Sequence, residues 1–152
     1  MDKRQLLLDQ LESKIKVFAP TLKVVVPATG WIKAIRIGLG MSLKQLGGLL
    51  SMTKQSAMEL ERREKEGSIT LKTLRETAKV LDMELVYGFV PKDVSLEALI
   101  DRKAHELATR IVRKTSTSMK LEDQENSKTR IEKAIKERAD QLKREKPKML
   151  WD

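Results

Sequence analysis

Six side chains with polar or flexible ends lie close together between residues 54 and 62. They are Lys54, Gln55, Ser56, Met58, Glu59 and Arg62. In a helix they face away from the apolar positions Ala57 and Leu60. Such side chains match base edges in the major groove: glutamine can bind adenine with two hydrogen bonds, lysine donates to guanine, glutamate accepts from cytosine, and methionine contacts the thymine methyl group. The pattern favours a helix that reads duplex DNA; the alternative is an ordinary helical hairpin with a solvated outer face.

Two helix starts position this surface. Ser42 and Gln45 have the spacing of a capping box, which predicts a helix from residue 43 with leucines along one face. Thr53 can cap a second helix after a short turn. The small residues Gly47 and Ala57 allow the two helices to cross closely. The spacing therefore predicts a helix-turn-helix whose second helix contributes base contacts. The predicted base-contacting residues are Lys54, Gln55, Ser56, Met58 and Glu59.

Phosphate contacts are predicted at helix starts and in the loop after the second helix. Thr70 can cap the next helix, where backbone amides attract anions. The loop ends at Gly67 and carries several cations, for which a solvated loop is the alternative. The predicted phosphate-contacting residues are Ser42, Thr53, Arg62, Arg63, Lys65, Thr70 and Lys72.

A stretch of the sequence resembles the phage repressor and Cro type of helix-turn-helix, often called the XRE family. The similarity lies in R-x-x-x-G-M-S-x-x-x-L-G followed by S-M-T-x-x-S-A-x-x-x-E. The resemblance implies a buried ion pair between Arg36 and Glu61, and a buried charge without its partner would cost several kcal/mol. Two positions depart from the family: Ser51 stands where the turn usually has glycine, and Leu43 stands where many members have a phosphate-contacting glutamine.

The whole chain is similar to a narrower group, the mobile mystery protein A family. The matching blocks are GWIKAIR, LGMS, ITLKTLRETAKVLD, LVYGFVPK, MKLEDQ and the terminal LWD. The resemblance implies a DNA-binding, antitoxin-like protein that partners a Fic-domain protein. Fic enzymes transfer AMP, and the inhibitors of one Fic class resemble each other in a motif [ST]-x-x-x-E-[GN]. Residues 118–123 approach that motif through Ser118 and Glu122, although Asp123 departs from it; an ordinary helix start is the alternative.

Composition narrows the function classes. The chain has 152 residues, no cysteine and a net charge of +9, with the basic excess spread over its whole length. This charge favours an anionic partner, whereas aromatic residues at 3% are too few to stack single-stranded bases. No apolar run approaches the roughly 20 residues of a membrane span, so no membrane contact and a cytoplasmic location are expected. His105 has no nucleophile at a motif spacing, and we expect neither an enzyme nor a cofactor or metal.

The flanking regions predict further helices and short strands. Residues 3–16 place Leu6, Leu7 and Leu11 on one side of a helix. Residues 22–26 form either a strand or an arm for the minor groove, and residues 84–90 predict a strand that pairs with residues 22–26 or with a second subunit. Residues 95–114 and 119–143 predict charged amphipathic helices; the second has a thin apolar stripe that favours partner contacts. Trp151 is either an interface anchor or packed against the body.

These observations predict a mainly α protein. Its centre is a lambda-repressor-like helix-turn-helix domain with one or two short β-strands, flanked by additional N- and C-terminal helices. We expect residues 1–29 to form a helix and arm, residues 30–94 the DNA-binding domain, and residues 95–152 a partner-binding or dimerisation region. The predicted function is sequence-specific binding of double-stranded DNA by a homodimer that acts as antitoxin and autorepressor beside a Fic-domain protein; a stand-alone repressor is the alternative.

Overall fold

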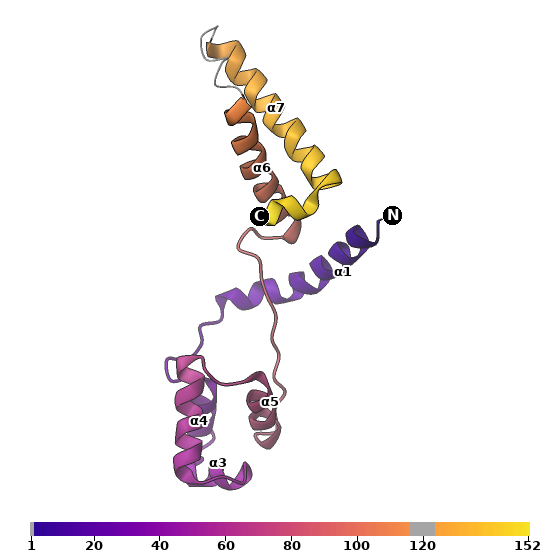
Figure 1. Cartoon of the computed structure of the whole chain (residues 1–152). Coiled ribbons are helices and arrows are strands. Elements are labelled where there is room, and N and C mark those ends of the chain that lie inside the picture. The colour runs from indigo at the N-terminus through magenta and orange to yellow at the C-terminus, as the bar shows by residue number, and fades with distance from the viewer. Residues whose placement is uncertain (1, 116–123) are drawn as a thin grey trace. The chain divides into compact units, whose positions relative to one another are not determined.

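The computed structural model describes residues 2–115 and 124–152, and every regular element in these ranges is helical (Figure 1). The chain divides into two compact units: residues 21–88, and residues 1–20 with 89–152. This division gives the N-terminal helix to the same unit as the C-terminal helices, whereas the sequence analysis separated them by expected role. The elements are α1 (Lys3–Phe18), η1 (Ala19–Lys23), α2 (Trp31–Gly38), α3 (Leu43–Leu49), α4 (Lys54–Glu66), α5 (Leu71–Val80), α6 (Leu96–Thr115), α7 (Gln124–Glu145) and η2 (Pro147–Trp151).

In three of the four α-helices in the unit of residues 21–88, the side chain of the residue just before the helix caps it. Ser42 accepts from the Gln45 amide at 3.1 Å, and the Gln45 side chain accepts from the Ser42 amide at 2.8 Å, which completes the predicted capping box. Thr53 and Thr70 begin α4 and α5 in the predicted way, with hydroxyls that accept from the amides of Ser56 and Thr73. Because α3 and α4 have separate caps, they are two helices, as predicted, and not one continuous helix.

The core of this unit lies where α2, α3, α4 and α5 meet. Its buried apolar side chains are Ile32, Leu46, Ala57, Leu60 and Leu81. Gly47 is required by the contact between α3 and the following turn, because a Cβ at this position would lie 2.8 Å from the carbonyl oxygen of Met52. The small residue predicted for the helix crossing therefore has a specific steric reason.

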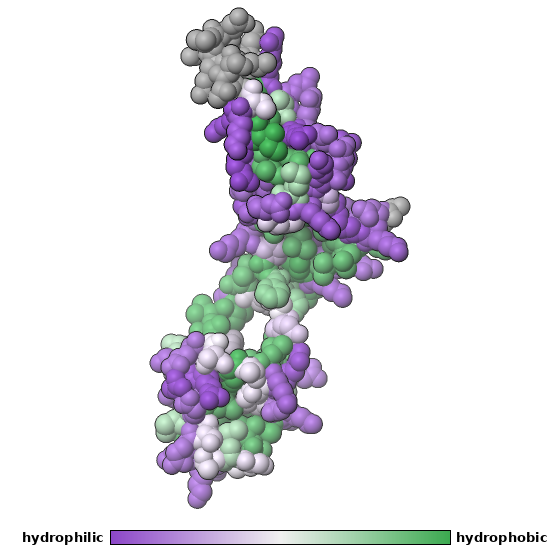
Figure 2. Space-filling view, viewed as in Figure 1, coloured by the Kyte–Doolittle hydropathy of each residue, from purple (hydrophilic) through white to green (hydrophobic). Residues whose placement is uncertain are grey.

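The other unit is built on a hairpin of α6 and α7 (Figure 1). Ala104 and Ala108, one turn apart on α6, are fully buried, and Ile135, Ala139 and Leu142 of α7 complete the core with Leu150 of η2. Figure 2 shows apolar side chains in the seam between largely polar outer surfaces. The thin apolar stripe of the second predicted helix was interpreted as a partner contact, but it packs against α6 within the same chain. Alanines on both helices let them approach closely, so a few large apolar residues are enough to form this core.

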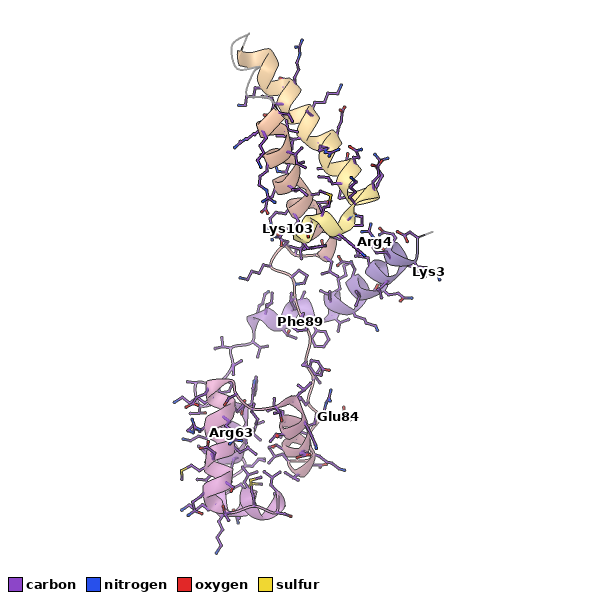
Figure 3. The ribbon with its side chains drawn as sticks, viewed as in Figure 1. Lys3, Arg4, Arg63, Glu84, Phe89 and Lys103 are labelled. Atoms are coloured by element: carbon purple, nitrogen blue, oxygen red, sulfur yellow. The ribbon has the colours of Figure 1, made fainter. Side chains whose placement is uncertain are left out.

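The two chain ends of this unit differ in how far they are covered. Leu150 is buried, whereas the neighbouring Trp151 is 56% exposed. In α1, Leu6, Leu7 and Leu11 are all exposed, so the predicted apolar stripe is present without cover. Polar contacts hold α1 instead: Arg4 donates to the Lys143 carbonyl at 3.2 Å, and the Glu12 carboxylate accepts from the Glu97 amide at 2.9 Å. Figure 3 labels Arg4 near the start of α1.

The predicted strands at residues 22–26 and 84–90 do not form within the described part of the chain. Residues 22 and 23 belong to η1 instead, and residues 24–27 and 84–90 have no regular structure. A strand needs a neighbouring strand to satisfy its amides and carbonyls, and no hydrogen bond joins these two segments. The strand prediction from β-branched composition was therefore wrong for the single chain. No helix of the described residues combines the length and apolar run of a membrane span.

Candidate nucleic-acid interface

Helix α4 presents one face to the core and the opposite face to solvent. Ala57, Leu60 and Glu61 are buried, which fixes the rotation of the helix about its axis. As a result, Lys54, Gln55, Ser56, Met58 and Arg62 are exposed on the other side, and Glu59 is partly exposed. The residues predicted to contact bases thus share one accessible helical surface, and Arg63, also on α4, is labelled in Figure 3.

A buried ion pair fastens α4 to α2. The Arg36 guanidinium donates to the Glu61 carboxylate from Nε at 3.0 Å and from Nη2 at 2.9 Å, and its Nη1 donates to the Met41 carbonyl at 3.0 Å. Both side chains are at least nine-tenths buried. The pair implied by the family resemblance is therefore present. Since each charge is compensated by several hydrogen bonds, the pair holds α4 against α2 without leaving an isolated charge in the core.

A second charge network lies on the exposed side of α4. Arg62 binds the carboxylates of Glu59 and Glu66, and Arg63 lies 3.4 Å from Glu59. The hydrogen bond from Arg62 holds the pKa of the Glu59 carboxylate at about 2, and the same bond raises the pKa of the Arg62 guanidinium. One predicted base contact and two predicted phosphate contacts are therefore bound to each other in the free protein. Glu59 and Arg62 must exchange partners before either can bind DNA in its predicted role.

Unlike Glu59 and Arg62, Lys54 and Gln55 have side chains without polar partners among the described residues. Within the part of the chain described here, neither side chain forms a hydrogen bond or an ion pair, and both are exposed at the first turn of α4. Their side chains need no rearrangement to meet a base edge. Ser56, by contrast, already accepts a hydrogen bond from the Thr53 hydroxyl at 3.0 Å.

Two concave surfaces border α4. One is shared with the start of α5 and gathers Gln55, Ser56, Glu59, Arg63 and Thr70. The other is shared with α2 and gathers Met58, Arg62 and Lys65 together with Lys33. Three of the predicted phosphate-contacting residues, Ser42, Thr53 and Lys72, lie on neither surface, although all three are exposed.

Sequence reasoning missed Glu64. Its carboxylate accepts from the amides of Trp31 at 2.8 Å and Ile32 at 2.7 Å, and so caps α2 from within α4. Gly30, the residue before α2, has no side chain for this purpose, and a Cβ there would meet the Glu64 carboxylate at 3.0 Å. Glycine before a helix is the only local sign of such a cap, because the partner lies more than thirty residues away in the sequence.

Two further expectations concern a partner enzyme and metal ions. The predicted inhibitory residues Ser118 and Glu122 lie outside the described residues. No group of acidic or histidine side chains that could bind a metal ion occurs among the residues that the structure describes.

The comparisons with known proteins leave the relationship of this chain open. No family model matches it, and neither a curated protein nor a solved structure matches it significantly. A functional proposal for this chain must therefore rest on its own residues and their arrangement.

Proposed function

We propose that residues 21–88 bind double-stranded DNA in a sequence-specific manner, with α3 and α4 acting as a lambda-repressor-like helix-turn-helix. The observation that carries this proposal is the surface of α4. The buried Arg36–Glu61 pair and the apolar core fix one side of the helix, while Lys54 and Gln55 are exposed and unengaged at its start. A recognition helix contacts base edges with residues of its N-terminal part, which is where these two side chains lie.

Electrostatics supports the same proposal. The chain carries a net charge of +9, and cations lie on the second half of α4 at Arg62, Arg63 and Lys65, with Lys33 of α2 beside them. Phosphate contacts by such residues fix the position of a protein on the duplex, and the polar side chains between them supply discrimination. The engaged state of Arg62 limits attraction to non-cognate DNA, because its charge is partly neutralised by Glu59 and Glu66.

The experiment begins with selection of duplexes from a random pool by the full chain, followed by fluorescence anisotropy on the selected duplex and on random DNA. Gln55→Ala should weaken binding to the selected site by about 1–3 kcal/mol and leave random DNA almost unaffected. Lys79→Ala on α5 is the matched control, since it removes an exposed side chain away from α4. Equal losses on both kinds of DNA would remove Gln55 from base readout, and selection of no preferred sequence would contradict the proposal.

We further propose that this DNA-binding protein is an antitoxin and autorepressor paired with a Fic-domain protein. The support is the resemblance to the mobile mystery protein A family across most of the chain. Co-expression with the product of the neighbouring gene, followed by affinity purification, should yield a stable complex. If a complex forms and Glu122 inhibits the Fic enzyme, Glu122→Gly should leave the complex intact and restore AMP transfer by that enzyme. Full inhibition by the variant would exclude an inhibitory role for Glu122.

A stand-alone transcriptional repressor is the second candidate, and one observation favours it. The α6–α7 hairpin buries Ala104, Ala108 and Leu142 in its own seam, so its apolar stripe needs no protein partner for cover. Absence of any complex with the neighbouring product, together with intact sequence-specific DNA binding, would favour this candidate.

A further inference from the structure

Two connecting segments of the chain expose an unusual amount of apolar surface. The first connector, residues 24–27, contains Val24, Val25 and Val26, of which Val25 is 87% exposed. The second connector, residues 84–90, contains Val86, Tyr87 and Phe89, exposed at 71%, 56% and 89%. Figure 3 labels Glu84 and Phe89 towards the two ends of the second connector. Scattered exposed apolar residues are ordinary, but runs of this kind mark an interaction surface.

The backbone of the connectors is also largely unpaired. The first connector has a backbone hydrogen bond at each end: the Val24 amide donates to the Thr21 carbonyl at 2.9 Å, and the Pro27 carbonyl accepts from the Gly30 amide at 2.9 Å. Between and beyond these bonds, the amides and carbonyls of residues 25, 26, 86 and 87 have no backbone partner among the described residues. Valine-rich segments with free backbone groups are templates for strand pairing with another chain.

The second connector is held in place for such a contact. Arg75 of α5 donates to the Tyr87 hydroxyl at 3.2 Å, and its guanidinium lies 5.5 Å from the centre of the Tyr87 ring. Beside the connector lies an apolar groove of about 300 Å³, bordered by Trp31, Leu74, Leu85 and Val86. A partner would therefore meet an ordered, mainly apolar surface and would spend little free energy on ordering it.

We propose that a second copy of this chain occupies this surface, and that the two copies associate through the first and second connectors. This dimer rests on the proposed function and deepens it, because it supplies the interface that a two-fold DNA site requires. The charges support association with a second copy. Lys23 is the only charged residue in 22–29, and Glu84 is the only charged residue in 84–90. A two-fold axis can place each lysine near the glutamate of the other copy.

The exposed area is also of the right size. Each fully buried aliphatic side chain removes roughly 60–120 Å² from water, and each aromatic side chain removes roughly 150–250 Å². Within residues 21–88, the exposed parts of the apolar side chains on this surface would together bury roughly 400–700 Å² per copy. They are Leu22, Val24, Val25, Val26, Val86 and Tyr87, with Trp31 and Met83 at the groove. The total for two copies reaches the roughly 1,000 Å² that a specific interface needs.

The test measures the mass of the full chain by light scattering after gel filtration, without DNA. The wild type should elute as a dimer of 17.4 kDa chains. Val25→Lys and Val86→Lys should each weaken association by about 100-fold or more, because each places a charge in an apolar interface. Ile37→Lys changes an equally apolar, exposed residue on α2 outside the connectors and should remain dimeric.

Circular dichroism and hydrogen exchange test whether the connectors themselves form the interface. Helix content should be unchanged in the lysine variants, since both residues are exposed in one chain. Amides at Val25, Val26, Val86 and Tyr87 should be protected in the wild type and lose that protection in the monomeric variants. A wild type that is monomeric at about 100 µM, or lysine variants that dimerise as well as the wild type, would overturn the inference. A dimer that selects no DNA sequence would instead contradict only the proposed function.

Discussion

The domain of residues 21–88 and the α6–α7 hairpin bury different kinds of side chain. In the domain, helices of 7 to 13 residues surround Arg36, Glu61 and Thr77, the three polar residues that are buried in the described part of the chain. In the hairpin, helices of 20 and 22 residues pack through an apolar seam of alanine, isoleucine and leucine. Helices as short as those of the domain are unstable alone, so side-chain caps and contacts between helices must hold them. The longer helices need mainly a continuous seam.

This difference predicts that the largest loss of stability follows from removing the buried arginine. Arg36→Ala should destabilise residues 21–88 by about 3–5 kcal/mol, because Glu61 stays buried without its donor and the Met41 carbonyl loses a hydrogen bond. Thermal unfolding, with hydrogen exchange to locate the change, measures the loss. Base preference on DNA should be unaltered in the folded fraction, since Arg36 holds α4 from its buried side.

A matched double variant isolates the charge effect. Arg36→Met combined with Glu61→Leu replaces the pair by apolar side chains of similar size and should recover most of the stability. If the double variant were as unstable as Arg36→Ala, the cause would be lost packing and not an uncompensated charge.

The stability of the α6–α7 hairpin should depend on how well its apolar seam is filled, and not on a buried charge. Leu142 is 1% exposed, so Leu142→Ala should cost about 2–4 kcal/mol through lost burial and an unfilled cavity. Because the two units have separate cores, exchange protection should fall in α6 and α7 and remain unchanged in α2–α5. Equal loss in both regions would show that the chain unfolds as one cooperative unit, and the two regions would then differ in composition only.

The same contrast explains which features were predictable from the sequence. Caps are local patterns, so Ser42, Thr53 and Thr70 were predicted with their helices, and the periodicity of residues 95–114 predicted α6. Contacts between distant segments have no local pattern, which is why the Glu64 cap of α2 and the alanine seam of the hairpin were missed. The Glu59–Arg62 bond lies within one helix turn, yet the sequence pattern alone did not separate that bond from the predicted phosphate contact of Arg62.

The strand error has a related cause. Valine-rich residues 24–26 and 84–90 prefer extended backbone, and a sequence pattern records that preference without naming the partner strand. Within one chain these segments do not pair. In the proposed dimer, the second copy would supply the strand partner that these segments lack within one chain.

The smallest predicted effect concerns the turn between α3 and α4. Ser51 has φ 55°, in the left-handed region that favours glycine, and its amide donates to the Gly48 carbonyl at 3.2 Å. Ser51→Gly should therefore raise the stability of residues 21–88 by about 0.5–1 kcal/mol: relief of the side-chain clash outweighs the greater backbone freedom of glycine in the unfolded chain. Gly67→Ser makes the reverse change at φ 80°, at the end of α4, and should lower stability by a similar amount. Chemical denaturation gives the free energy of unfolding of both variants. A loss of stability in Ser51→Gly would mean that unfolded-state entropy outweighs strain in this turn. Since the helices of this domain depend on their ends more than on their length, even this single turn residue should shift the denaturation midpoint measurably.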